Sequence, residues 1–222
     1  MKLKDQVAIV TGAGRNIGEE IAKVLAQNGA RVAVVDMDPG RGNKVAAEIV
    51  KAGGEAAAFV ADVSSEADVA RLVKDVTGKW GRVDILVNNA AISDNKAILE
   101  VTKEQWDKVL AVTLTGPFLM SQHAARAMVA GKRGGKIVNV GSTSGFFGRS
   151  RAVAYAAAKG GVATGASPRG CRWGAPRRRV AVRCCRSLRA RASFSLVSPS
   201  GDPATAAGSR CPGCSPPGRE PR

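Results

Sequence analysis

Residues 7–18 read VAIVTGAGRNIG, and this stretch decides the fold. Its first four residues form a continuous apolar run that predicts a buried strand, and Thr11 and Gly12 begin a tight loop directly after it. Apolar residues then recur at helical spacing over residues 17–27, and Gly29 follows as a helix stop. A strand, a glycine-rich loop and a helix in this order predict the start of a parallel βαβ unit.

The same alternation of strands and helices continues to about residue 162. Short apolar runs predict further strands at residues 31–35, 56–60, 83–87 and 136–140. Helical patterns are expected at residues 43–51, 66–79 and 103–129, and from residue 151 onward. Because the strands are continuously apolar, we expect both faces of the sheet to be buried. The sequence therefore predicts an α/β fold, a doubly wound parallel sheet of the Rossmann type that ends after the fifth strand and the helix from residue 151.

The composition changes after residue 162, so we expect a folded domain over residues 1–162 and a tail over residues 163–222. The whole chain has a net charge of +16. Arginine dominates the tail, which contains no lysine and only two acids, Asp202 and Glu220, and all five cysteines lie there. Such a segment lacks the apolar surface that offsets the entropy of ordering, so we predict disorder. Its residues are those of GC-rich codons, and a frameshifted origin is a further hypothesis.

Composition also limits the location and the kinds of site. The predicted domain has no cysteine, and the sequence has no signal-peptide pattern and no apolar run of membrane-spanning length, so we expect a cytoplasmic protein. Cys211 and Cys214 have the spacing of half a zinc site, but the single histidine, His123, is far away, and we predict no metal. The basic tail leaves open a nucleic-acid-binding module, although only Trp173 and Phe194 place aromatic rings among the arginines.

The glycine-rich loop is a candidate site for a pyrophosphate group. Its small residues allow close backbone approach, and the following helix N-terminus supplies amide donors. The candidate residues are Gly12, Gly14, Arg15, Asn16, Ile17 and Gly18. Asp36 ends the second strand, where an acid can bind the ribose 2′-hydroxyl of NAD and repel the 2′-phosphate of NADP. We therefore favour NAD, while the cationic Arg15 keeps NADP open as the alternative.

A second group of candidates lies around the helix from residue 151. Tyr155 and Lys159 are four residues apart, so they share a helix face, and the ammonium favours the phenolate of its neighbour. A phenol in this setting can exchange a proton with an alcohol or carbonyl oxygen. Ser142 follows the fifth strand, where its hydroxyl could hold the same oxygen. We predict these three side chains as the catalytic group.

Taken together, these motifs resemble the short-chain dehydrogenase/reductase family over residues 1–162. The resemblance also includes Asp62-Val63 after the third strand and Asn88-Asn89-Ala90 after the fourth. It implies an NAD(P)-dependent oxidoreductase that transfers hydride between a nicotinamide cofactor and an alcohol or carbonyl substrate, as 3-oxoacyl-carrier-protein reductases and glucose dehydrogenases do. It further implies that Asp62 and Val63 flank the adenine, and that Asn88 and Ala90 line the cofactor cleft.

By the same resemblance, Tyr155 is the general acid and base, Lys159 tunes it, and Ser142 holds the substrate oxygen. Tyr155 and Lys159 would also contact the cofactor. The chain departs from the family pattern at Thr113, which stands where the family carries a catalytic Asn that anchors a water of the proton relay. Because threonine offers one hydroxyl in place of an amide, we expect a weakened relay.

Two further departures concern the loops and the tail. Asn16 replaces the middle glycine of the family loop, and asparagine is among the residues that best tolerate a positive φ. Ala91 stands where glycine usually follows Asn-Asn-Ala. Relatives are homo-oligomers that use segments beyond residue 162 for assembly and for covering the substrate. A catalytically impaired or inactive nucleotide-binding fragment is therefore the alternative to an active enzyme.

Overall fold

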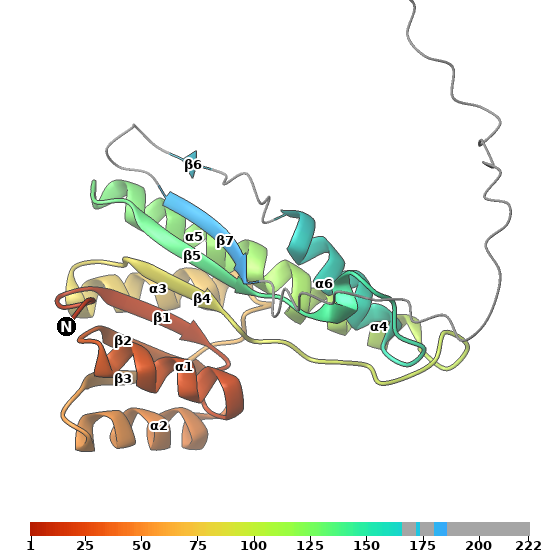
Figure 1. Cartoon of the computed structure of the whole chain (residues 1–222), viewed down its shortest axis with the longest axis horizontal. Coiled ribbons are helices and arrows are strands. Elements are labelled where there is room, and N and C mark those ends of the chain that lie inside the picture. The colour runs from red at the N-terminus through yellow and green to blue at the C-terminus, as the bar shows by residue number, and fades with distance from the viewer. Residues whose placement is uncertain (166–171, 174–179, 186–222) are drawn as a thin grey trace, which may run out of the picture. The chain divides into compact units, whose positions relative to one another are not determined.

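A mostly parallel β-sheet forms the centre of the computed structural model, which describes residues 1–165, 172–173 and 180–185 (Figure 1). The strands lie in the order β3-β2-β1-β4-β5-β7-β6, and every neighbouring pair except β6 and β7 is parallel. Their bounds are β1 Val7–Thr11, β2 Arg31–Asp36, β3 Glu55–Val60, β4 Ile85–Asn88, β5 Gly135–Val140, β6 Arg172–Trp173 and β7 Val180–Cys185. This is the predicted doubly wound parallel sheet.

The helices lie close to the predicted positions, with one local difference. Their bounds are α1 Asn16–Gln27, α2 Pro39–Lys51, α3 Glu66–Trp80, α4 Lys103–Leu110, α5 Gly116–Ala130 and α6 Val153–Gly165. The helix expected over residues 103–129 is two α-helices joined by a π-helical segment, η1 Ala111–Thr115. A short 3₁₀ turn, η2 Thr143–Gly145, follows β5.

Two hydrophobic cores lie on opposite faces of the sheet. Side chains alternate along β1, so that Val7 and Ile9 belong to one core and Ala8 and Val10 to the other. The first core packs against α3 and α5, and the second against α1 and α2 (Figure 1). The expected burial of both faces holds for β1 and β4, whereas β3 is the edge strand and stays partly exposed.

The sheet continues past the boundary expected at residue 162. Val180–Cys185 pairs in parallel with β5, and Val180 lies opposite Gly135. Val180 and Val182 favour a strand in this segment, because valine is a strong strand former. Residues 163–165, 172–173 and 180–185 of the predicted tail lie in α6, β6 and β7. The disorder predicted for the rest of the tail, the sequence around Phe194 and the pair Cys211 and Cys214 lie outside the described residues.

The strand order places a topological switch point at the centre of the sheet. From β1 the chain adds β2 and β3 outward on one side, and then returns to place β4 on the other side of β1. The carboxyl ends of β1 and β4 therefore carry loops that diverge to opposite faces. Open α/β sheets bind their ligands in the crevice that this divergence creates.

Candidate active site

A cleft of about 360 Å³ opens at the carboxyl ends of β1, β2 and β4. Eight of the residues predicted for cofactor binding line it, namely Gly12, Arg15, Asn16, Ile17, Gly18, Asp36, Val63 and Ala90. Eight residues without a predicted role also line it, namely Val35, Met37, Arg41, Ala61, Asn89, Ala91, Ile92 and Val112. The predicted cofactor residues therefore gather largely at one place, the switch point of the sheet.

The glycine loop is built by close backbone approach. Gly12 has a φ of +60°, and a Cβ atom there would lie 3.0 Å from the Cα of Ala90. A Cβ atom at Gly18 would overlap the carbonyl oxygen of Gly12, so the first turn of α1 is packed directly on the loop. Asn16 has a φ of 52°, which explains why asparagine is tolerated where the family carries glycine.

The N-terminus of α1 is open for an anion. Its N-cap residue, Arg15, has an extended backbone and makes no side-chain cap. The first residues of the helix, Asn16, Ile17 and Gly18, line the cleft. Amide donors at a helix N-terminus and the positive end of the helix dipole favour a negatively charged group at this position.

Asp36 is fixed by backbone amides at the far side of the loop. Its Oδ2 accepts a hydrogen bond from the Gly14 amide at 3.0 Å, and its Oδ1 accepts one from the Asp38 amide at 3.0 Å. Gly14 is needed here because a Cβ atom would lie 2.7 Å from both Asp36 Oδ2 and Arg41 Cβ. Arg41 lies in the same part of the cleft, and its Nε is 3.2 Å from Asp38 Oδ2.

The adjacent asparagines Asn88 and Asn89 point in different directions. Asn89 lines the cleft and donates from Nδ2 to the carbonyl oxygens of Thr11 and Gly12, at 3.0 Å each. Asn88, which was expected in the cleft wall, is instead buried and donates to Asn139 Oδ1 at 2.7 Å. Alternation along β4 explains the difference, because successive side chains of a strand point to opposite faces.

Asp62 and Val63 connect the cleft to the start of α3. Val63 lines the cleft, while Asp62 Oδ1 accepts bonds from the amide and the hydroxyl of Ser64, at 2.8 and 2.7 Å. The Asp62 amide donates to Asp68 Oδ2 at 3.0 Å, and this bond lowers the pKa of Asp68 below its ordinary value. Asp68 therefore fixes the backbone that carries the two predicted adenine neighbours.

The predicted catalytic residues gather at the end of β5 rather than among the residues that line the cleft. Lys159 is buried, its Nζ donates to the carbonyl oxygen of Val140 at 2.6 Å, and it lies 5.7 Å from the centre of the Tyr155 ring. Ser142 begins η2, two residues after Val140, and its Oγ accepts from the Ser144 amide at 3.2 Å. Tyr155 and Lys159 therefore lie on the same face of α6, as predicted.

Glycine also brings η2 and α6 together. A Cβ atom at Gly145 would lie 2.7 Å from the backbone carbonyl of Lys159, so only glycine allows η2 to lie directly against this helix. This packing brings the segment that begins with Ser142 to the helix that carries Tyr155 and Lys159.

Thr113 occupies a buried position in the π-helical segment. Its hydroxyl accepts from the Ile92 amide and donates to the Ile92 carbonyl oxygen, at 3.1 Å each. A single hydroxyl can do both because it is a donor and an acceptor. A π-helical turn within an α-helix is frequently found at a functional site. Thr113 therefore connects the π-helical segment to Ile92, which belongs to the loop after β4 and lines the cleft.

No metal centre or membrane helix is found within the described part of the chain. In residues 1–165, 172–173 and 180–185, no group of three His, Cys, Asp or Glu side chains is placed to hold a metal ion. None of the helices in the same ranges is both long and apolar enough to cross a bilayer. His123, on α5, lies 3.8 Å from Glu66.

Comparison with known proteins shows the family to which the chain belongs. The short chain dehydrogenase family model matches residues 6–185. Sorbitol dehydrogenase from Cereibacter sphaeroides is 41% identical over 162 residues, which cover 73% of this chain and 62% of that protein. Galactitol 2-dehydrogenase from Agrobacterium fabrum is 39% identical over 73% of this chain and 62% of its own length.

Two further comparisons agree. The 3-oxoacyl-[acyl-carrier-protein] reductase from Synechocystis is 39% identical over 72% of this chain and 65% of that protein, so the chain spans less than two thirds of these relatives. A short chain dehydrogenase structure from Mycobacterium smegmatis superposes with a TM-score of 0.72 at 35% identity, covering 74% of this chain and 70% of the other. The chain belongs to the short chain dehydrogenase family.

Proposed function

We propose that this chain is an NAD(P)-dependent oxidoreductase that transfers hydride between a nicotinamide cofactor and an alcohol or carbonyl substrate. The observation that carries the proposal is the position of Lys159 Nζ, 2.6 Å from the Val140 carbonyl oxygen and 5.7 Å from the centre of the Tyr155 ring. The ammonium is buried and lies on the same helix face as the phenol, which is the arrangement that the proposal uses for proton exchange with a substrate oxygen.

The residues around the cleft fit a dinucleotide. The open N-terminus of α1 would hold the pyrophosphate, since its amides have no side-chain cap and the glycines leave room for close approach. The Asp36 carboxylate, held by two backbone amides, would accept hydrogen bonds from the adenosine ribose. Val63 and Ile92 would provide apolar walls for the rings. When bound, a nicotinamide dinucleotide supplies or accepts the hydride.

Three side chains would exchange the proton and bind the substrate oxygen. Tyr155 would hold at its phenol oxygen the proton that passes to a carbonyl in reduction, and would accept it again in alcohol oxidation. Lys159 would ease both directions by stabilising the phenolate. Ser142, at the end of β5, would donate a hydrogen bond to the same substrate oxygen.

NAD is the preferred cofactor in this proposal. A 2′-phosphate would place negative charge beside the Asp36 carboxylate, which cannot turn away without losing its bonds to Gly14 and Asp38. Arg41 and Arg15 are the opposing cations in the cleft. Arg41 already forms an ion pair with Asp38, so its attraction for a 2′-phosphate is weaker. Both cofactors are therefore compared in the test below.

We infer the substrate class from the names of three relatives. Their names refer to sugar alcohols in two cases and to a 3-oxoacyl group in the third. Carbon 2 of galactitol is a secondary alcohol and a 3-oxo group is a ketone, and we infer a secondary alcohol or ketone substrate for this chain. A useful panel contains sorbitol, galactitol and a 3-oxoacyl thioester.

The test is a turnover assay on the purified full chain with that panel and each cofactor. We expect turnover that Tyr155→Phe lowers by about 10²–10⁴-fold, because the phenol proton is lost while the ring stays. Cofactor affinity, measured by fluorescence, should change little in this variant. Cofactor binding without turnover in the parent chain would overturn the proposal and favour the impaired nucleotide-binding domain instead.

A further inference from the structure

The helix that carries Tyr155 begins at a residue that cannot cap it. Ala152 directly precedes α6, which begins at Val153, and its methyl side chain accepts no hydrogen bond. Ala152 is fully buried and has a φ of 132°, a conformation that costs energy for any residue with a Cβ. Its amide donates to the carbonyl oxygen of Lys96 at 3.0 Å, so a distant segment holds the backbone in this conformation.

The missing cap comes from the same distant segment. Asp94 Oδ2 accepts a hydrogen bond from the Ala154 amide and Asp94 Oδ1 accepts one from the Tyr155 amide, at 3.3 Å each. These are the second and third residues of the helix, the amides that an N-cap side chain normally satisfies. The carboxylate also lies at the positive end of the helix dipole, where a negative charge is favourable.

A second contact between the two segments is less important. Arg151 Nη2 lies 3.0 Å from Glu100 Oε2, but both side chains are largely exposed. Exposed ion pairs contribute little to stability because water screens them. Asp94 is therefore the side chain through which the distant segment binds the first turn of α6.

We propose that Asp94 is a positioning residue for Tyr155, which holds the first turn of α6 so that the phenol and the Lys159 ammonium keep their alignment. This inference rests on the proposed function for its catalytic meaning. The mechanism is local: one carboxylate binds the backbone of Tyr155 itself, and Lys159 follows one turn later on the same helix. The loop after β4 therefore contributes to the site through the helix backbone.

Two measurements test the positioning without any turnover. Removing both acceptors in Asp94→Ala should speed hydrogen exchange at the Ala154 and Tyr155 amides about fivefold or more, because a lost N-cap costs about 1 kcal/mol. Tyr155 is the only tyrosine, so its ring signals are unambiguous in NMR spectra. Their contacts with the Lys159 side chain should weaken in Asp94→Ala, and Asp94→Asn, which keeps one acceptor, should fall between the two.

The kinetic readout separates positioning from general destabilisation. Asp94→Ala should lower kcat about tenfold while the KM for the cofactor stays within about twofold, because α1 and its loop are not touched. Glu100→Gln, which removes the exposed ion pair on the same segment, should leave both constants unchanged. Unchanged exchange and unchanged ring contacts in Asp94→Ala would overturn the inference, whether or not the parent turns over. A parent without turnover, with the predicted exchange and contact changes, would overturn only the proposed function.

Discussion

The two sides of the site are built in different ways. On the proposed cofactor side, the loop after β1 packs closely on α1 and on the loop after β4, and Gly12 and Gly18 leave no room for a Cβ atom. On the catalytic side, polar side chains reach to backbone groups, as Lys159 does to Val140 and Thr113 does to Ile92. Each side also uses the other device, at Asp36 and Asn89 on the first and at Gly145 on the second. Added atoms should nevertheless damage the first side at Gly12 and Gly18, and removed polar atoms should damage the second at Lys159 and Thr113.

The largest expected effect is that of Gly18→Ala. The added methyl group would overlap the Gly12 carbonyl oxygen, so the loop or the first turn of α1 must move. We expect a loss of about 3 kcal/mol in the free energy of unfolding, measured by urea denaturation, and a loss of NAD binding. The matched control is Gly78→Ala on α3, where a Cβ atom meets nothing within 4 Å and should stabilise the helix by up to about 1 kcal/mol. Equal stability of the two variants would contradict this account of the loop.

The next largest effect concerns the catalytic side. Thr113→Val keeps the shape of a fully buried side chain but removes both bonds to Ile92, so we expect a loss of about 2 kcal/mol and a lower kcat. Thr113→Asn restores the family residue with a donor and an acceptor, and it should raise kcat above that of the parent, because the threonine is expected to weaken the relay. An unchanged kcat in Thr113→Asn would contradict that expectation.

Local patterns were sufficient for the fold and for predicting most of the residues that gather at the cleft. Continuous apolar runs predicted five strands, and the tolerance of asparagine for positive φ predicted the conformation of Asn16, because both depend on residues close in the chain. The loop glycines and Asp36 were identified for the same reason. The π-helical turn at Thr113 was not, because its apolar spacing is compatible with a continuous α-helix.

Contacts between distant segments account for what the sequence did not reveal. Asp94 binds amides sixty and sixty-one residues later, and Arg41 reaches the cleft only because α2 packs beside the glycine loop. Asn89 was read as part of a motif, but its role required knowing that it meets the Thr11 and Gly12 carbonyls. Polar residues in loops carry no periodicity, so their partners appear only when the chain is folded.

A smaller effect is expected at Asp36, on the preference for NAD over NADP. Asp36→Asn removes the negative charge but keeps an acceptor for the Gly14 amide, so the loop should stay folded. The ratio of NAD to NADP affinity should fall about tenfold, because the repulsion of a 2′-phosphate is lost. Asp107→Asn, which removes the same charge from an exposed position on α4, is the control and should leave the ratio unchanged. An unchanged ratio in Asp36→Asn would remove the basis for preferring NAD.

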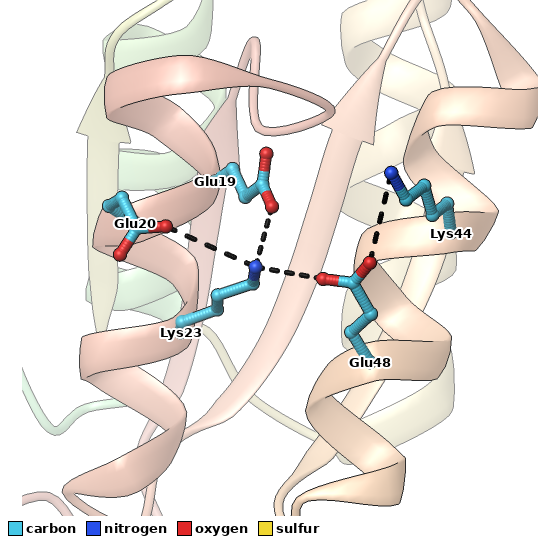
Figure 2. Close-up of polar contacts among 5 residues, drawn as sticks. All are labelled: Glu19, Glu20, Lys23, Lys44 and Glu48. Carbon is cyan, nitrogen blue, oxygen red and sulfur yellow. Dashed lines mark hydrogen bonds and ion pairs between the residues drawn. The ribbon is translucent and has the colours of Figure 1, made fainter.

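A cluster of charged side chains connects α1 and α2 (Figure 2). Lys23 of α1 lies 2.5 Å from Glu19 and 2.8 Å from Glu48 of α2. Hydrogen bonds to Glu19 and Glu48 raise the pKa of Lys23 above its ordinary value, and the bond from Lys23 lowers the pKa of Glu48. Because these side chains meet water, their contribution to stability is small and sensitive to salt.

Lys23→Met should therefore give the smallest effect, with a definite pH dependence. Glu48, with its pKa lowered in the folded chain, stabilises above about pH 4.5 and loses this contribution as the pH falls. Lys23, with its pKa raised, stabilises below about pH 10 and loses this contribution as the pH rises through its folded value. The difference in Tm between parent and variant should be constant between these limits, and smaller in strong acid and in high salt. Lys44→Met, which removes a more exposed cation 3.9 Å from Glu48, is the control, and an equal or larger effect there would show that Lys23 does not join the helices.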